Sequence, residues 1–321
     1  MLEEPGRLSV RLSDEPARPP GHALVKVACV GLCGSDYHAF AGKQPIYTYP
    51  RILGHELSAV IVEPPEERPD LKAGDRVAIE PYLACGSCRT CALGRPNCCE
   101  RLQVLGVHVD GGLQEYLSIP ASTLHRSEKL TLEQLALVET LGIGAHAVNR
   151  SGLRAGETAL VVGAGPIGLA VAQFAKASGA GVRAVEPNAA RASFARQFVE
   201  DVVPAANGYL ADVVFDATGN ARAMEQSLQF VAPGGRLVFV GLCADKIAID
   251  DPLLHRREIA LFASRNSAHQ FPRIIGMIER GEIDTSSWIG ERLSLEEVPE
   301  KFAGLRARPE LVKAVVHVGP R

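Results

Sequence analysis

Apolar and polar residues alternate in two different ways along the chain, and the difference divides it into two parts. Before about residue 150, short apolar runs at 23–30, 57–62 and 77–80 are separated by polar or proline-rich loops, a pattern typical of β-strands. From Gly156 onward, strand-length apolar runs alternate with helical segments, as in a parallel α/β sheet. We therefore expect an α/β protein with a β-rich part and a doubly wound part.

The second part is regular except at one point. It predicts strands at 158–162, 182–186, 212–216, 236–241 and 258–263, with helices ending near 178, 231 and 280, and a last strand at 312–318. If 202–203 is also a strand, only about eight residues separate it from the next one, whereas a parallel crossover takes a dozen or more. Either the third strand is degenerate or a crossover helix has been lost.

The composition restricts the function classes. The chain has 321 residues, 46% of them hydrophobic and 22% charged, with a net charge of −3. This is an ordinary globular composition of roughly two domains, and without a long basic run we expect no nucleic-acid partner. Residues 158–175 carry no charge, but glycines and a proline interrupt them, so we expect a strand–turn–helix unit and no membrane span. The acidic first residues lack the apolar segment of a signal peptide, which predicts a cytoplasmic location.

Five of the eight cysteines lie between residues 85 and 99. Without an export signal, such clustering favours metal binding over disulfides. The spacing C-x2-C-x2-C lets one loop wrap a tetrahedral zinc ion with sulfur ligands and leave no open position, which is typical of a structural site. Cys85, Cys88 and Cys91 form this run, and the spacing alone does not decide whether Cys98 or Cys99 is the fourth ligand.

A second group of metal-binding residues follows the strand at 23–30. Cys33 is followed by the pair His55 and Glu56, and a thiolate, an imidazole and a carboxylate with one position left open suit a catalytic zinc ion. Asp36 is placed to accept a hydrogen bond from the ring of His55. Glu139 lies among apolar residues, and we expect it near the same ion.

Ser35 and His38 lie within the same stretch as Cys33. A hydroxyl and an imidazole at these positions are able to pass a proton between a substrate alcohol and solvent. We therefore predict that they are the catalytic pair.

The first turn of the second part carries a dinucleotide-binding pattern. The sequence G-x-G-x-x-G follows a predicted strand and precedes a helix, and it contains Gly163, Gly165, Pro166, Ile167 and Gly168. Glu186, 18 positions after the last glycine, is predicted to accept from the ribose hydroxyls and to repel a 2′-phosphate, which favours NAD over NADP. Arg183 and Arg191 flank this glutamate, and we expect Arg191, Thr218 and Val240 also to line the cofactor site.

Together these residues resemble the zinc-dependent medium-chain dehydrogenase/reductases of the alcohol dehydrogenase superfamily. The resemblance covers nearly the whole chain and is strongest to the polyol, threonine and sugar-acid branch. Residues 94–99 (Gly-Arg-Pro-Asn-Cys-Cys), 105–108 (Leu-Gly-Val-His) and 264–266 (Ser-Arg-Asn) resemble its L-galactonate and L-idonate dehydrogenase-like members.

The resemblance implies a GroES-like catalytic domain at 1–146 with a structural zinc lobe at about 81–101, a Rossmann domain at 147–282, and a return to the first domain at 283–321. It implies a catalytic zinc ion on Cys33 and His55 with Glu56 or Glu139, and it selects Cys99 as the fourth ligand of the structural zinc ion. It also implies a homodimer or homotetramer. The chain is shorter than expected near its start and around residues 200–211.

The predicted function is reversible hydride transfer between a secondary alcohol, such as a polyol or sugar acid, and NAD. Two alternatives remain at this point, a dehydrogenase acting on an amino alcohol such as threonine and an inactive nicotinamide-binding regulator on the same fold. A zinc-free reductase would not need Cys33 or His55.

Overall fold

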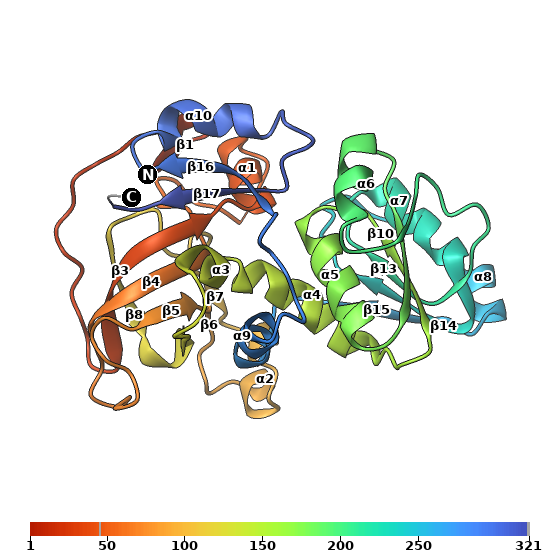
Figure 1. Ribbon diagram of the computed structural model, residues 1–321, viewed down its shortest axis with the longest axis horizontal. Coiled ribbons are helices and arrows are strands. Elements are labelled where there is room, and N and C mark those ends of the chain that lie inside the picture. Colours follow the sequence, from red (N-terminus) through yellow and green to blue (C-terminus); the bar gives the residue numbers. More distant parts are fainter. Residues whose placement is uncertain (45, 320–321) are drawn as a thin grey trace. The chain divides into compact units, whose positions relative to one another are not determined.

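The computed structural model describes residues 1–44 and 46–319, and the chain forms two compact units. Unit 1 consists of Met1–Glu139 and Phe271–Arg321, and unit 2 of Thr140–Gln270. Both ends of the chain therefore contribute to unit 1, where the C-terminal strands, in blue, lie beside the N-terminal ones (Figure 1). The limits predicted from the sequence, 146/147 and 282/283, remain a prediction.

Unit 1 is built on a seven-stranded sheet, which is the expected β-rich part. Its order is β16-β17-β3-β4-β5-β9, and β8 also pairs with β3. Every pairing is antiparallel except that of β16 with β17. The strands are β3 (His22–Gly31), β4 (Glu56–Glu63), β5 (Arg76–Ile79), β8 (Tyr116–Pro120), β9 (Leu124–Arg126), β16 (Ile289–Ser294) and β17 (Lys313–His317).

Shorter elements surround this sheet. Two small antiparallel ribbons pair β1 (Leu2–Glu4) with β2 (Arg7–Leu8) and β6 (Tyr82–Leu83) with β7 (Gln103–Val104). The helices are α1 (Gly34–Phe40), α2 (Arg89–Ala92), α3 (Leu132–Ala136), α9 (Phe271–Glu279) and α10 (Val298–Leu305), with single 3-10 turns at Pro96–Cys98 and Ala121–Thr123. Helix α4 (Val138–Ser151) begins in unit 1 and continues in unit 2.

The core of unit 1 follows from the alternation of residues along its strands. Val25, Val27 and Ile79 have no exposed surface, and the aromatic side chain of Phe302 closes the core from α10. Each such side chain contributes about 1.5–3 kcal/mol when it is removed from water. The apolar runs seen in the sequence are thus the source of this unit's stability.

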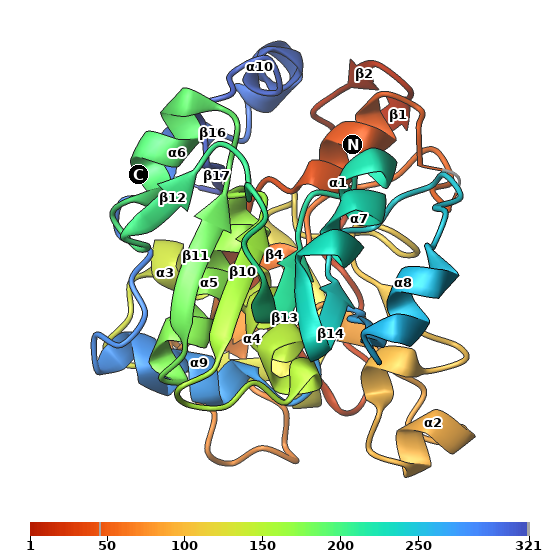
Figure 2. The same cartoon turned by 90° about the vertical axis from the view of Figure 1, so that its right-hand side faces the viewer.

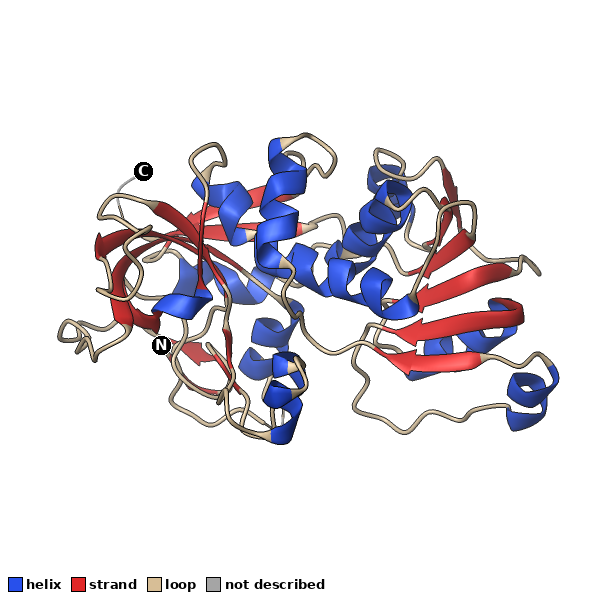
Figure 3. Cartoon of the chain, turned by 90° about the horizontal axis from the view of Figure 1, so that it is seen from below, coloured by secondary structure: helices blue, strands red, loops and turns tan. Residues whose placement is uncertain are grey.

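Unit 2 is a six-stranded parallel sheet of order β12-β11-β10-β13-β14-β15, the arrangement of a Rossmann domain. Figure 2 shows its strands side by side, and Figure 3 shows helices along the sheet. The strands are β10 (Thr158–Val162), β11 (Gly181–Val185), β12 (Asp201–Val203), β13 (Ala211–Asp216), β14 (Val231–Phe239) and β15 (Ala260–Ala263). The helices are α5 (Pro166–Ala177), α6 (Ala189–Ala195), α7 (Ala221–Ser227) and α8 (Asp251–Arg256), and Leu228–Phe230 is a 3-10 turn.

The third strand exists, and the crossover helix after it is missing. Strand β12 pairs with β11, and the structure contains no helix between Val203 and Ala211. Eight residue steps reach about 26–29 Å. The strand register places Ala211 three strand spacings, about 14 Å, to the side of Val203 and five residues, about 17 Å, back along the sheet, which is a diagonal of about 22 Å. An extended link therefore suffices.

The uncharged segment 158–175 forms β10, a turn and most of α5, as expected. Across residues 1–44 and 46–319, no helix has both the length and the apolar character needed to cross a membrane.

Candidate metal and cofactor sites

Cys33 is the residue that precedes helix α1. Its backbone N–H donates to Asp36 Oδ2 at 2.9 Å, so the carboxylate of the third helical residue satisfies one of the free donors at the helix start. This capping stabilises a helix of seven residues, which the sequence analysis did not predict. Ser35 and His38 consequently lie three positions apart on one side of α1.

Strand pairing brings His55 and Glu56 to Cys33. The antiparallel register of β3 and β4 places Gly31 opposite Glu56, so Cys33, just beyond β3, meets His55, just before β4. The turn before them needs glycine, because Gly54 has φ +98° and a Cβ there would lie 2.7 Å from a methyl group of Val30. One ligand atom from each of Cys33, His55 and Glu56 lies within 4.8 Å of the other two.

The ring of His55 is buried between Ser35 and Asp36. Its Nε2 lies 3.4 Å from Ser35 Oγ, and its Nδ1 lies 3.8 Å from Asp36 Oδ1, which is longer than a hydrogen bond. Burial opposes a charge on the imidazole, but Asp36 and Cys33 outweigh it and raise the pKa of His55. Burial also raises the pKa of Asp36, which has no exposed surface.

Glu56 is held on one side only. Its Oε1 accepts from the ammonium of Lys313, and its Oε2 is buried without a hydrogen-bond partner. Buried polar atoms are normally satisfied, so a buried carboxylate oxygen without a protein partner, on a residue that groups with Cys33 and His55, fits the binding of a cation. Burial lowers the pKa of Lys313, but the charges of Glu56 and Cys33 outweigh this and raise it.

Glu139 lies in the first turn of α4 and is outside this group. One of its carboxylate oxygens accepts from the hydroxyl of Tyr82 on β6. Burial raises the pKa of Glu139, and its charge in turn contributes to the raised pKa of His55. The structure therefore places Glu139 close to the cluster but tied to another partner.

The predicted catalytic pair is not joined directly. Ser35 contacts His55, and the structure shows no hydrogen bond between Ser35 and His38 among the residues it describes. The side chain of His38 is exposed. The partial burial of its ring lowers the pKa of this imidazole, and the positive charges of Arg306 and Lys43 lower it further.

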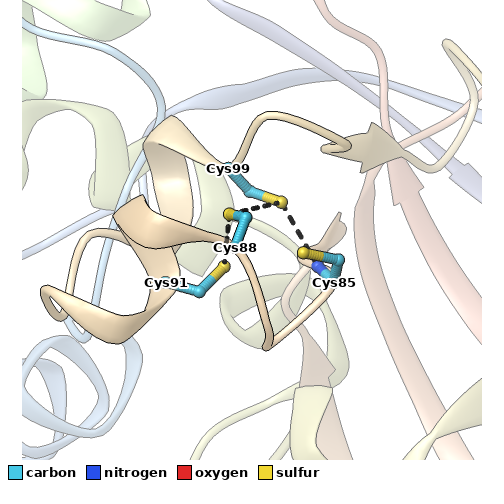
Figure 4. A group of neighbouring side chains, drawn as sticks. All are labelled: Cys85, Cys88, Cys91 and Cys99. Carbon is cyan, nitrogen blue, oxygen red and sulfur yellow. Dashed lines mark hydrogen bonds between the residues drawn. The ribbon is translucent and has the colours of Figure 1, made fainter.

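The second metal-binding group is a lobe between β6 and β7. It contains Cys85, Cys88, Cys91 and Cys99, whose sulfur atoms lie within 4.8 Å of one another (Figure 4). Cys88 Sγ is 3.5 Å from Cys91 Sγ and 3.8 Å from Cys99 Sγ. Tetrahedral zinc with 2.3 Å bonds spaces its sulfurs by about 3.8 Å, so the lobe fits zinc. Cys98 is exposed and lies outside the group.

Hydrogen bonds prepare some of these thiols to act as thiolates, the form that binds metal. The backbone N–H of Ser87 lowers the pKa of Cys85 to about 5, and the hydroxyl of Thr90 lowers that of Cys88 to about 7. Backbone N–H groups of Cys85 and Arg101 both point at Cys99 Sγ, each at 3.3 Å.

In unit 2 the glycine-rich turn joins β10 to α5. Gly163 has φ +91°, and Gly165 precedes the helix, whose first residue is Pro166. A side chain at Gly168 would overlap the carbonyl oxygen of Gly163, so glycine allows the helix to approach the strand. Free N–H groups at the start of α5 fit a pyrophosphate.

Glu186 follows β11 and is buried beside this turn. Its Oε2 accepts from the backbone N–H of Ala164 at 2.9 Å, and its Oε1 accepts from that of Asn188 at 2.9 Å. Carboxylate oxygens have further lone pairs for ribose hydroxyls. Arg183 is engaged elsewhere, because it pairs with Asp201 at 2.5 Å and its guanidinium lies 4.0 Å from the ring centre of Tyr209.

The other predicted cofactor residues follow neighbouring strands of the same sheet. Thr218 lies just after β13, and its hydroxyl donates to Asp216 Oδ1 at 2.7 Å. Val240 lies just after β14. Arg191 is in the first turn of α6, where its backbone N–H donates to Asn188 Oδ1 at 3.0 Å. The carboxyl ends of parallel strands share one edge, so β10, β11, β13 and β14 deliver these residues to the ligand-binding edge of the sheet.

Comparison with known proteins identifies a dehydrogenase domain in each of the two units. Residues 19–129 match the alcohol dehydrogenase GroES-like domain, and residues 166–280 match the zinc-binding dehydrogenase domain. The chain is 37% identical to L-galactonate-5-dehydrogenase of Escherichia coli K12 over 331 residues, covering 98% of this chain and 97% of the relative. The chain belongs to the zinc-dependent medium-chain dehydrogenase/reductases.

Solved structures of this family include nicotinamide complexes. An Escherichia coli CFT073 alcohol dehydrogenase complexed with NADH is 27% identical, with a TM-score of 0.93 and coverage of 98% of this chain and 97% of the other. A Sinorhizobium meliloti 1021 protein bound to NADP is 30% identical, with a TM-score of 0.91 and the same coverage. The chain is thus a zinc-type alcohol dehydrogenase that uses a nicotinamide cofactor, and the predictions of fold, family, enzyme class and cofactor type are confirmed.

Two residues that contact the carboxylates of the candidate metal site were missed in the sequence analysis. Lys313 is a lysine within the apolar run 311–318, and a charged residue in a strand that reads as buried is the signal that would have found it. Tyr82 lies just before the cysteine lobe, and nothing in its neighbourhood points to Glu139, which is 57 residues away.

Proposed function

We propose that this dehydrogenase reversibly oxidises a secondary alcohol of a polyol or sugar acid with NAD. The observation that carries the proposal is the buried Oε2 of Glu56, which has no hydrogen-bond partner, on a residue that groups with Cys33 and His55 within 4.8 Å. The similarity to an L-galactonate dehydrogenase over nearly the whole chain supports a sugar-acid or polyol substrate.

Cys33, His55 and Glu56 would hold the catalytic zinc ion, which supplies Lewis acidity that lowers the pKa of a substrate hydroxyl. Glu139 is the alternative carboxylate, and its hydrogen bond with Tyr82 makes Glu56 the better candidate. Cys85, Cys88, Cys91 and Cys99 would hold the structural zinc ion, because four sulfurs leave no position open.

Ser35 is the group we assign to accept the proton of the substrate hydroxyl. Its Oγ lies 3.4 Å from His55 Nε2, at the border of the metal-binding group. His38, on the same side of α1 and exposed, would pass the proton to solvent. The lowered pKa of His38 keeps its imidazole neutral and able to accept.

Bound nicotinamide would supply the hydride acceptor, and the residues of unit 2 orient it. The turn at Gly163–Gly168 fits the pyrophosphate, and Thr218 and Val240 lie at the same sheet edge. Glu186 supports NAD over NADP, because a buried carboxylate accepts from ribose hydroxyls and repels a 2′-phosphate.

The substrate is tested by a screen of NAD reduction over polyols, aldonates including L-galactonate, and amino alcohols including threonine. We expect turnover with an aldonate or a polyol. The rate should fall at least about tenfold in Ser35→Ala, since a positioned proton acceptor typically raises the rate about 100-fold or more. Turnover confined to threonine would favour the amino-alcohol alternative. Tight NADH binding without turnover of any alcohol would favour the regulator.

We also propose that the protein forms a homodimer or homotetramer. Strand β15 is an edge of the parallel sheet, its residues Ala260 and Leu261 are exposed, and no charge interrupts 259–263. Uncharged exposed edges are suited to pairing with another strand. Light scattering should give two or four times 34.2 kDa, and Leu261→Lys should lower this mass. A monomeric wild-type protein would contradict the proposal.

A further inference from the structure

Lys313 is an ammonium group buried inside unit 1. Its side chain is 3% exposed, and it lies on β17 among the apolar residues Ala314, Val315 and Val316. An uncompensated buried charge is strongly destabilising, so a lysine is retained at such a position only with a partner.

The partner is the metal-site residue Glu56, which is 1% exposed. Lys313 Nζ donates to Glu56 Oε1 and also lies 3.4 Å from the carbonyl oxygen of Leu32. Strands β17, β3 and β4 are neighbours in the sheet, and this order carries Lys313 to the carboxylate from 257 residues away. The ammonium thus contacts the side of the carboxylate that is not free for a metal ion.

The other carboxylate oxygen of Glu56, Oε2, occupies space that is left by the absence of a side chain at Gly31. A Cβ at Gly31 would overlap Glu56 Oε2, so only glycine leaves room for the carboxylate there. Oε2 has no protein partner, while Cys33 and His55 offer ligand atoms within 4.8 Å. The two oxygens of Glu56 therefore differ, because Oε1 is bound to Lys313 and Oε2 has no protein partner.

The charges around this group are mostly negative. Asp36, Glu56 and Glu139 act on His55 or on one another electrostatically, and Cys33 acts on His55 as well. Lys313 is the buried ammonium that faces them. It neutralises one negative charge of the site without supplying a ligand.

We propose that Lys313 is a positioning residue that limits how strongly Glu56 binds the catalytic metal ion. By holding Oε1 it keeps Glu56 from offering both oxygens, and so it keeps a position on the metal available to the substrate. This inference rests on the proposed function, because it requires a metal ion on Cys33, His55 and Glu56.

The test is Lys313→Met, which keeps the length of the side chain and removes its charge. The rate at which a chelator in excess removes the catalytic zinc ion should fall roughly 10- to 100-fold, the range that outer partners of metal ligands typically have on affinity. Imidazole should bind the cobalt-substituted enzyme more weakly by a similar factor, measured from the cobalt absorption spectrum, because Glu56 now competes with it. An unchanged or faster release would overturn the proposal.

A double variant separates positioning from charge alone. In the Glu56→Gln background, Lys313→Met should change zinc release by no more than about threefold, so the effects of the two substitutions should not be additive. Equal slowing in both backgrounds would show that Lys313 acts on the metal only through its charge and would overturn the positioning role. Lys313→Arg, which keeps the cation, should release zinc at close to the wild-type rate.

Two controls guard against a variant that does not fold and against confusing this inference with the proposed function. If Lys313→Met does not fold, Lys313→Gln replaces it, because glutamine keeps a hydrogen-bond donor without the charge. This variant should also slow zinc release, by a smaller factor. Zinc release at the wild-type rate in Lys313→Gln would overturn the proposal. Wild-type zinc content distinguishes the two proposals. One zinc ion per chain would contradict the proposed function itself, whereas two zinc ions without a response to Lys313 would contradict this inference alone.

Discussion

Gly31 lies opposite Glu56 across the β3–β4 pair, and a single added methyl group at residue 31 would overlap Glu56 Oε2, the carboxylate oxygen that has no hydrogen-bond partner. The metal site thus depends on the absence of a side chain as well as on the ligands themselves. This relationship could not be read from the sequence, because it arises only when two strands take one particular register.

Gly31→Ala should displace Glu56 and weaken the catalytic zinc site. The forced shift should also cost about 1–3 kcal/mol in free energy of unfolding, as overpacking of a core does. Metal analysis after dialysis against a weak chelator, with urea unfolding in parallel, checks both effects. The matched control is Gly34→Ala, where a Cβ would meet no atom within 4 Å. Equal zinc content in the two variants would contradict the role of Gly31.

Cys99 and Cys98 are adjacent in sequence and differ in environment. Cys99→Ser should lose the structural zinc ion and lower the zinc content from about two to about one per chain, because a sulfur ligand is removed from a four-sulfur site. Cys98→Ser should retain both, since its thiol is exposed and outside the group. Metal analysis of the two variants shows which cysteine is the fourth ligand. Loss of one zinc ion in Cys98→Ser, with two retained in Cys99→Ser, would make Cys98 the ligand.

Glu186→Ala should weaken the preference for NAD. The variant removes a charged acceptor for the ribose hydroxyls, worth about 1.5–3 kcal/mol, and therefore should raise the KM for NAD roughly 10- to 150-fold. The KM for NADP should rise less or fall, because repulsion of the 2′-phosphate is also removed. Steady-state kinetics with both cofactors measure the ratio, and a ratio unchanged from wild type would rule out Glu186 as the discriminating residue.

The pH dependence of the proton relay follows from the charges around His38. Burial, Arg306 and Lys43 lower the pKa of His38, so its neutral, proton-accepting form should persist to lower pH than that of an ordinary imidazole near 6.5. Arg306→Gln removes one of the positive charges and should raise the pKa of His38, moving the acidic limb of kcat to higher pH.

The measurement is an NMR titration of the His38 ring proton, with His38→Asn to assign the signal, next to the pH–rate profile. A pKa of His38 that does not move in Arg306→Gln would show that the arginine charge is screened. A moved pKa with a fixed kcat profile would remove His38 from the relay.

Local patterns predicted much of this fold. The glycine turn at Gly163–Gly168 and the strand 158–162 were predictable because apolar runs, turn glycines and a helix start all point to the same structure. Helix α1 was not, because a segment of seven residues beginning Gly-Ser has little helical propensity of its own, and Cys33 is not one of the residues preferred just before a helix.

The residue types of the candidate metal site could be predicted from the sequence, whereas the partners around them could not. Cysteine and histidine spacing indicates zinc, but which carboxylate faces the ion depends on partners far along the chain. Lys313 reaches Glu56, and Tyr82 reaches Glu139, only through the packing of unit 1. The missing helix after β12 was visible from the sequence only as a distance too short for a normal crossover.

The central claim is that Cys33 is a ligand of a catalytic zinc ion in an alcohol dehydrogenase. Zinc content per chain of Cys33→Ala, determined together with its NADH affinity and its alcohol oxidation rate, tests this most directly. The account predicts about one zinc ion in place of about two, unchanged NADH binding and no detectable oxidation, because the structural lobe and the glycine turn are untouched. Two zinc ions with full activity in Cys33→Ala would contradict it.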